Sequence, residues 1–166
     1  YGLTVREGSI FFNIRTSYNT NLTSHPPIYS CKIAPPTPNA NATFSQSGTI
    51  IWNIPYGTTA KQILNMFSED CYIADVGGNE LTENSTLATG DLVMVRGTQT
   101  ANVYLTIAVL GDANGDAKIN GMDLIRIKKY LNKMETDAIY GLCGDMNADG
   151  HVDSTDISML VSLINN

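Results

Sequence analysis

The sequence predicts two modules, a β-rich N-terminal module with one helix over residues 1–109 and a small all-α C-terminal module of two loop–helix repeats over residues 110–166. Three observations lead to this prediction. Residues 1–109 contain short apolar runs bounded by turn residues, which is typical of strands. A stretch rich in Asp, Asn and Gly occurs twice near the C-terminus, at a spacing of 33 residues. Apolar residues at helical spacing follow each copy.

Six apolar runs of the N-terminal module are expected to form strands. The clearest is Thr49–Ile54, and the longest is Val103–Leu110, which leads directly into the first Asp-rich copy. A hairpin turn is expected at Gly77–Asn79, because glycine and asparagine accept the backbone angles of tight turns. The other runs lie within residues 5–16 (centred on 10–14), 28–33, 71–76 and 92–95.

One helix is expected in this module, beginning after a cap at Thr58 or Thr59 and ending near Ser68. A helix between two strands fits a plain sandwich poorly, so a β-grasp-like topology stays open. The Pro-rich segment 34–41 is either a linker or a long loop. Because residues 1–33 are too short to fold alone, we favour a single module. The helix has one apolar stripe, formed by Ala60, Ile63, Leu64 and Phe67.

The repeat begins at Asp112 and again at Asp145, and each copy carries side-chain oxygens at loop positions one, three, five, nine and twelve. In the first copy these residues are Asp112, Asn114, Asp116, Asn120 and Asp123. In the second copy they are Asp145, Asn147, Asp149, Asp153 and Asp156.

This pattern of oxygens is typical of a calcium loop. A hard cation such as Ca²⁺ takes six to eight oxygen ligands, and a twelve-residue loop adds the backbone carbonyl of position seven, here Lys118 and His151. The alternative is a pair of acidic turns, since Asp, Asn and Gly favour turns in any case. Two matches at a fixed spacing, each followed by an apolar-periodic segment, favour two bound Ca²⁺ ions.

Three loop positions affect the geometry of the two sites. Position twelve is Asp where the usual loop ends in Glu, so the shorter carboxylate must lie closer to the ion. Position six needs a sharp turn, often at positive φ, which costs Ala117 more than Gly150. We therefore expect a weaker or slightly distorted first site. Position eight is β-branched in both loops, Ile119 and Val152, which suits a short extended pairing between them.

The paired Gly-Asp-x-Asn-x-Asp loops, each ending in Asp and followed by a single helix, resemble a dockerin module over residues 110–166, about a third of the chain. The resemblance implies a non-catalytic, calcium-dependent plug that docks its parent protein onto a cohesin module of a cellulosome-like scaffold. It implies a role in polysaccharide degradation or cell-surface attachment, and a secreted or bacterial cell-surface location. A β-rich module directly before a dockerin also resembles an X module, which implies an Ig-like fold.

By the same resemblance, cohesin contacts come from loop positions ten and eleven and from helix positions seventeen, eighteen and twenty-two. The two sets differ in charge and polarity, so we expect one preferred binding orientation. In the first copy the residues are Gly121, Met122, Lys128, Lys129 and Lys133. In the second they are Ser154, Thr155, Val161, Ser162 and Asn166.

The two repeats are expected to contain helices at about residues 121–133 and 154–165, packed antiparallel about a pseudo-twofold axis. The connector 135–143 has room for a short helix. A calcium buffer or sensor of the EF-hand class is the main alternative, but a full EF-hand has a helix before each loop. Here a strand precedes the first loop and Gly141–Gly144 precedes the second, which favours the dockerin. The buried helix residues are expected to be Leu124, Ile127, Leu131, Ile157, Leu160 and Ile164.

Charge and composition exclude several classes of partner. The net charge is −6, and the repeat region holds nine acidic and five basic residues. This argues against nucleic acid, which needs a basic surface. No apolar run is long enough to span a membrane. Three cysteines give no complete disulfide framework, although Cys31 and Cys71 stay open as a pair. Without an initiator Met, the chain is expected to be the C-terminal part of a larger protein.

No residue is predicted to be catalytic. His25 has no evident partner, His151 lies inside a calcium loop, and calcium accounts for the close carboxylates. A C-terminal fragment of a glycoside hydrolase is an alternative that no acid pair supports. Trp52 and Tyr56 are an alternative site, a platform on which a sugar ring would stack. A lone Trp in an apolar strand is more often half-buried in the core. Only Gly111 separates the last strand from Asp112, so we expect the two modules to be held together.

Overall fold

The computed structural model describes residues 2–6, 9–13, 30–32, 35–96 and 104–165. Contacts divide the chain into two compact units, residues 1–34 with 98–103 and residues 35–97 with 104–166. The module boundary at 109/110 stays a prediction. Among the described helices, none has the length and apolar character needed to cross a bilayer.

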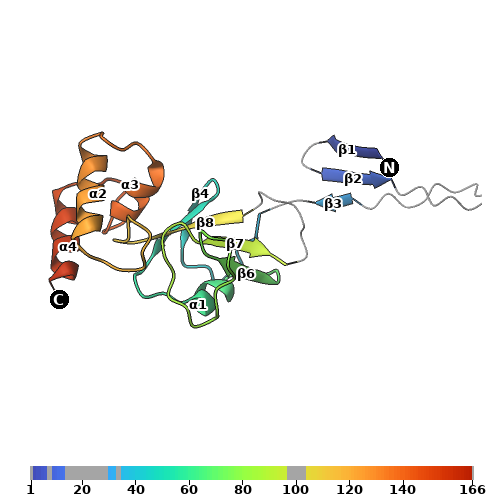
Figure 1. Cartoon of the computed structure of the whole chain (residues 1–166), viewed down its shortest axis with the longest axis horizontal. Helices are drawn as coiled ribbons and strands as arrows, with labels where there is room; N and C mark the ends of the chain where they lie inside the picture. Colours follow the sequence, from blue (N-terminus) through green and yellow to red (C-terminus); the bar gives the residue numbers. More distant parts are fainter. Residues whose placement is uncertain (1, 7–8, 14–29, 33–34, 97–103, 166) are drawn as a thin grey trace, which may run out of the picture. The chain divides into compact units, whose positions relative to one another are not determined.

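The first unit contains an antiparallel three-stranded sheet in the order β1-β2-β3 (Figure 1). Its strands are β1 (Gly2–Arg6), β2 (Ser9–Asn13) and β3 (Ser30–Lys32). The strands expected around residues 10–14 and within 28–33 are confirmed for the described residues, whereas β1 was not predicted.

The second unit contains a five-stranded sheet in the order β4-β5-β8-β7-β6. The central pair β5–β8 is parallel and the other neighbours are antiparallel. The chain between the parallel strands β5 and β8 contains α1, as a β-grasp-like topology requires. The assignment of the sheet to that fold class stays a proposal. The strands are β4 (Ser45–Ser47), β5 (Ile50–Ile54), β6 (Cys71–Ala74), β7 (Leu92–Val95) and β8 (Tyr104–Val109).

Helix α1 (Ala60–Leu64) is shorter than expected. After Leu64 the backbone hydrogen bonds span three residues in place of four, from Met66 to Ile63 and from Phe67 to Leu64. Its start is confirmed at Thr59, whose N–H donates to the Gln62 side chain at 2.8 Å. The amide of Asn39 donates to the carbonyl oxygens of Asn65 and Phe67, at 2.9 and 3.1 Å. These contacts satisfy carbonyls that the end of a helix leaves unpaired. Of the predicted apolar stripe, Ala60, Ile63 and Phe67 are buried and Leu64 is half-buried.

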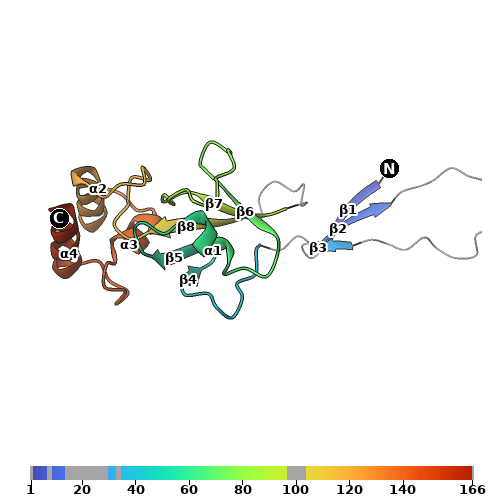
Figure 2. The ribbon, with the colours of Figure 1, turned by 90° about the horizontal axis from the view of Figure 1, so that it is seen from below.

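Both faces of the central strands are buried. One face packs with α1 into a core that includes Ile51, Leu105 and Ile107 (Figure 2). On the other face, Ala108 belongs to a second core formed mainly by residues after 110, and Ile50 and Trp52 pack against it. This alternation follows from the two-residue period of a strand. Trp52 is therefore half-buried under the C-terminal helices, whereas Tyr56 is 48% exposed.

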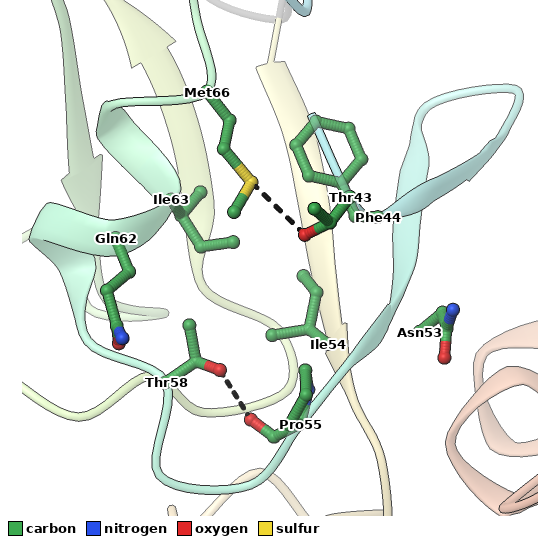
Figure 3. Close-up of a pocket in the computed structure, with 9 residues that line it drawn as sticks. All are labelled: Thr43, Phe44, Asn53, Ile54, Pro55, Thr58, Gln62, Ile63 and Met66. Atoms are coloured by element: carbon green, nitrogen blue, oxygen red, sulfur yellow. Dashed lines mark hydrogen bonds between the residues drawn. The ribbon is translucent and has the colours of Figure 1, made fainter. Parts of the chain in front are cut away.

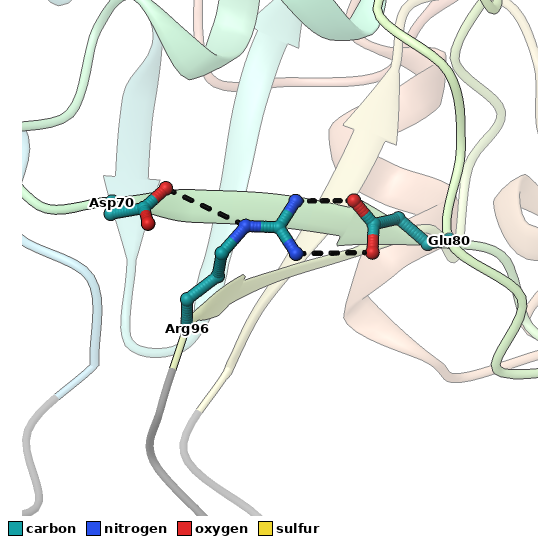
Figure 4. Close-up of polar contacts among 3 residues, drawn as sticks. All are labelled: Asp70, Glu80 and Arg96. Atoms are coloured by element: carbon teal, nitrogen blue, oxygen red, sulfur yellow. Dashed lines mark hydrogen bonds and ion pairs between the residues drawn. The ribbon is translucent and has the colours of Figure 1, made fainter.

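Arg96, just after β7, joins the ends of three segments (Figure 4). Its guanidinium makes two hydrogen bonds to the Glu80 carboxylate and lies 3.5 Å from an oxygen of Asp70. The Arg96 hydrogen bond lowers the pKa of Glu80 below its ordinary value. The cluster lies at the surface, where such pairs add little to stability.

The C-terminal segment contains α2 (Gly121–Leu131), α3 (Ala138–Gly144) and α4 (Ser154–Ile164). The two long helices are confirmed within two residues. Ile127 and Leu160 are fully buried. Half-buried side chains pack against them, including Leu124, Ile157 and Ile164.

The prediction that Leu131 is buried is wrong, because this side chain is 36% exposed. The preceding residue, Tyr130, is the one that lies against α3. Its hydroxyl is so close to Gly141 that a Cβ there would approach it to 2.6 Å. The last turn of α2 therefore packs through Tyr130, and Leu131 faces outward.

Helix α3 confirms the short connector helix and corrects the comparison with EF-hands. It begins at Ala138, after Asp137, whose carboxylate caps the helix by accepting the Ile139 N–H at 3.1 Å, and it continues to Gly144. The Gly141–Gly144 segment is helical, so a helix does precede the second loop. Gly144 packs closely against the core, because a Cβ at this position would lie 3.1 Å from Ile127 and 3.3 Å from Val152.

Candidate calcium-binding loops

The two Asp-rich loops have the same backbone pattern, with positive φ at positions four and six. These positions are Gly115 (φ 75°) and Ala117 (57°) in the first loop, and Ala148 (58°) and Gly150 (89°) in the second. The expected positive φ at position six is confirmed, and position four was not foreseen. Each loop thus has one glycine and one strained alanine, in exchanged places.

The carboxylates at position one organise each loop from its centre. Each accepts N–H groups from positions five and six of its own loop. At these positions the donors to Asp112 are Asp116 and Ala117, both at 3.2 Å, and the donors to Asp145 are Asp149 at 3.0 Å and Gly150 at 2.9 Å. Asp112 also accepts the Gly115 N–H at 2.8 Å, from position four.

The carboxylates at position twelve close each loop. Each accepts N–H groups from positions two, three and nine, which ties the end of the loop to its beginning. The donors to Asp123 are Ala113, Asn114 and Asn120 at 3.0, 3.0 and 2.9 Å. The donors to Asp156 are Met146, Asn147 and Asp153 at 2.8, 3.3 and 2.8 Å.

The side chains at position nine also cap the helix that follows. Asn120 accepts the Met122 N–H at 2.8 Å at the start of α2. Asp153 accepts the Thr155 N–H at 2.6 Å at the start of α4, and this bond lowers the pKa of Asp153. Capping of this kind satisfies N–H groups that have no partner in the first turn.

Burial makes the loop carboxylates costly without a cation. Asp112, Asp123, Asp145 and Asp156 are between 0 and 3% exposed. Desolvation raises the pKa of Asp112. Among the described residues, no Lys, Arg or His lies within ion-pair distance of a loop carboxylate. Buried charges are usually paired or bound to a metal, and the partners that the structure shows for these four carboxylates are N–H groups, an arrangement that suits a bound cation.

The donor set is chemically suited to a hard cation, because every candidate ligand is an oxygen. No group of three or more Asp, Glu, His or Cys side chains that could hold a metal is found in the described part of the chain. The carboxylates of each loop, three in the first and four in the second, do not form such a group in this structure, and the candidate sets also include amide and carbonyl oxygens. Asn114 and Asn147 contribute side-chain amides at position three.

Residues 110–165 match the family model of the Dockerin type I domain. This segment, hereafter the dockerin domain, is the part of the chain for which the resemblance is confirmed. Calcium dependence and docking to cohesin modules are general properties of this family, and the module itself is non-catalytic. The β-rich region before it is consistent with a separate module. No curated protein and no solved structure matches the chain.

The pairing expected between positions eight of the two loops is not found. The described residues show no bridge or backbone hydrogen bond between Ile119 and Val152. Both side chains instead pack against the core of the dockerin domain. Ile119 lies over Gly111, where a Cβ would approach its methyl to 2.8 Å.

The dockerin domain is held firmly to the sheet, as expected from the short junction. Residues 35–97 and 104–166 belong to one compact unit with a shared second core. The Gly111 N–H donates to the Cys143 carbonyl at 2.9 Å, just before the second loop. The chain thus leaves β8 and is fixed to α3 within two residues. Cys71 and Cys143 are buried free thiols, and the Cys31 side chain lies outside the described part.

The residues predicted to contact cohesin lie mostly at the surface. All five of the first copy are exposed, and Lys129 lies 3.8 Å from Glu135. In the second copy Val161 is half-buried, and Asn166 lies outside the described residues. Large apolar side chains that the spacing did not predict as contacts are also exposed on the same helices, namely Ile125 (50%), Met159 (41%) and Leu163 (46%).

A small pocket of about 200 Å³ lies between β5 and α1 (Figure 3). It belongs to the part of the second unit that precedes the dockerin domain, residues 35–97 and 104–109, hereafter the sheet module. Thr58 donates to the Pro55 carbonyl at 2.7 Å on one side, and Thr43 contacts the Met66 sulfur on the other. Asn53, which has φ 61°, lies beside the shift in register between β5 and β8. The lining contains no ionisable side chain, so it provides no acid–base pair and no base that could activate a threonine hydroxyl.

Replacing Ala117 by glycine is expected to stabilise the dockerin domain by about 0.5–1 kcal/mol. Left-handed φ costs a non-glycine residue about 1–2 kcal/mol, and glycine loses about 0.5–1 kcal/mol more backbone entropy on folding. The measurement is urea unfolding in saturating calcium. Ala113→Gly is the control, because Ala113 is buried and does not have positive φ, so it should destabilise. A lower midpoint for Ala117→Gly would contradict the argument.

Proposed function

We propose that the dockerin domain binds two Ca²⁺ ions and thereby docks its parent protein onto a cohesin module of a cellulosome-like scaffold. The observation that carries this proposal is the repetition of one loop geometry inside the segment that matches the Dockerin type I domain. Both loops have the same positive-φ positions, and in both the carboxylate at position twelve accepts N–H groups from positions two, three and nine. A role in polysaccharide degradation or cell-surface attachment, and a secreted location, belong to the same proposal.

The ligands we assign are loop positions one, three, five, seven, nine and twelve. In the first loop they are Asp112, Asn114, Asp116, the Lys118 carbonyl, Asn120 and Asp123. In the second they are Asp145, Asn147, Asp149, the His151 carbonyl, Asp153 and Asp156. Bound calcium would supply the positive charge that the buried carboxylates lack, so its binding free energy would contribute to folding.

The test is binding of the full chain to a panel of cohesin modules, in calcium and in chelator. Binding to one cohesin class that chelator abolishes would support the proposal. Calcium binding with no cohesin bound would favour the second candidate, a calcium buffer or sensor. One observation favours that candidate, since α3 makes the second repeat a helix–loop–helix. Failure of both loops to bind calcium would overturn both candidates.

The difference between the two predicted contact sets leads to a further expectation about orientation. The first set presents Lys128 and Lys129 on α2, and the second presents Ser154 and Thr155 at the start of α4, all exposed. We expect alanine at both residues of one pair to weaken cohesin binding by about tenfold or more, which is about 1.4 kcal/mol. Alanine at both residues of the other pair should change it little.

Calorimetry of the two double variants measures this difference, and each variant is the control for the other. Equal small effects, with binding lost only when all four residues are replaced, would show instead that the dockerin domain binds in two orientations related by its internal symmetry.

A further inference from the structure

Thr89 lies outside the dockerin domain, in the loop that leads into β7, but it contacts the first calcium loop directly. Its backbone N–H donates to the second carboxylate oxygen of Asp112 at 3.0 Å, and Thr89 is only 7% exposed. Resting on the calcium assignment above, we propose that Thr89 positions Asp112, so that the sheet module forms part of the support of the first calcium loop and not of the second.

The Thr89 side chain joins three parts of the fold at this point. Its hydroxyl accepts the Val109 N–H at 2.9 Å, at the end of β8. The same oxygen lies 3.4 Å from the sulfur of Cys143 in α3. These contacts hold the Thr89 backbone in place, and therefore hold the N–H that reaches Asp112.

The two loops differ at the corresponding contacts. In the described part of the chain, the Asp145 carboxylate accepts hydrogen bonds only from N–H groups of its own loop. Asp112 accepts the Thr89 N–H in addition to those of its own loop. The repeat therefore provides an internal comparison in which one position-one carboxylate is supported by the sheet and the other is not.

The glycine at position four of the first loop is explained by the backbone of the same Thr89. A Cβ at Gly115 would approach the Thr89 carbonyl oxygen to 2.5 Å, so position four of the first loop has no room for a side chain. In the second loop this position is Ala148 at φ 58°. A Cβ at Gly150 would meet nothing within 4 Å. At Gly115 the close approach of Thr89 excludes a side chain, and glycine also avoids the strain of positive φ that Ala148 bears.

The hydrogen bond from Thr89 to Asp112 is expected to affect the calcium affinity of the first loop. Residues that hold a metal ligand by hydrogen bonds typically change affinity by about 10- to 100-fold when they are replaced. The strain at Ala117 is expected to lower the calcium affinity of the first loop. The Thr89 contact is expected to raise it, because it fixes Asp112 before the ion binds. The first loop is therefore preorganised by a residue that lies well before the dockerin domain in the chain.

The first experiment compares Gly115→Ala with Gly150→Ala in the full chain. Both replace a left-handed glycine, with φ 75° and 89°, but only the first forces a Cβ against Thr89. Calcium titration followed by the amide NMR signals of each loop gives the affinities separately. We expect Gly115→Ala to reduce first-loop affinity about tenfold more than Gly150→Ala reduces second-loop affinity, and to shift the Thr89 amide signal. Equal reductions would overturn the proposal.

A second pair of variants tests the hydroxyl. Thr89→Val keeps the shape but removes the bond to Val109, and Thr89→Ser restores it. We expect Thr89→Val to weaken calcium at the first loop about tenfold with the second loop unchanged, and Thr89→Ser to recover most of the loss. An equal loss at both loops would show only a general effect on folding and would overturn the positioning role. If neither loop of the unaltered chain binds calcium, the proposed function fails as well, which the unaltered titration reveals.

Discussion

Chelation of calcium is expected to convert Cys143 from a protected thiol into one that is readily alkylated. Cys143 is 0% exposed and lies in the core that joins α3 to β8, together with Ile127 and Leu160. Without calcium, the buried carboxylates of both loops repel one another and oppose folding of this core. Calcium at a hundred times its dissociation constant stabilises the folded state by about 2.7 kcal/mol per site, which is about a 100-fold change in the open population.

Alkylation rates at each cysteine, read by peptide mass spectrometry, measure this effect. Cys71 is the internal control, because it is 8% exposed in the core on the other face of the sheet, which contains no dockerin residue. We expect chelator to accelerate reaction at Cys143 far more than at Cys71. If Cys143 stays protected in chelator, the loops hold their fold without calcium, and the charge argument is wrong.

Truncating Leu160 is expected to have the largest effect of any apolar substitution on α4. Leu160 is 0% exposed in the centre of the dockerin core, and Leu→Ala in such a position costs about 2–5 kcal/mol. Leu163 provides a matched control on the same helix, since the same substitution there removes a side chain that is 46% exposed. Leu163→Ala should change the unfolding free energy by about 0.5 kcal/mol or less, as exposed sites usually do.

Denaturant unfolding in saturating calcium compares the two leucine variants. A cost at Leu160 no larger than that at Leu163 would mean that the core around Ile127 and Leu160 does not carry the stability of the dockerin domain. Cohesin binding provides a second measurement, because a loss caused by Leu163→Ala with unchanged stability would place the exposed apolar face of α4 in the interface.

The loops and their helices could be predicted because their signals are local. The positions of the oxygens, the positive φ at Ala117 and the burial of Ile127 and Leu160 all follow from spacing within one repeat. Leu131 was predicted incorrectly because the helical period cannot show that Tyr130 turns the end of α2 toward α3. Helix α3 was only partly foreseen, since Gly141 and Gly144 lower helix propensity and tertiary packing overrides it.

The arrangement of the sheet could not be read from the sequence to the same degree. Strand β4 is Ser45-Gln46-Ser47, which has no apolar alternation and forms only as an edge against β5. The parallel pairing of β5 with β8 joins segments that are distant in the chain, and no local pattern specifies it. The role of Thr89 was missed for the same reason. Its one trace in the sequence is the glycine at position four of the first loop, where the second loop has alanine.

The shared second core has a consequence for transplanting this dockerin domain onto other proteins. A segment cut at residue 110 leaves Ala108, Ile50 and Trp52 behind and exposes the apolar side of α3 that they cover. A fusion that begins at residue 35 keeps that surface closed and keeps Thr89 beside the first loop. The segment to transfer is thus larger than residues 110–165, which match the family model. A fusion is best joined in the Pro-rich segment before β4.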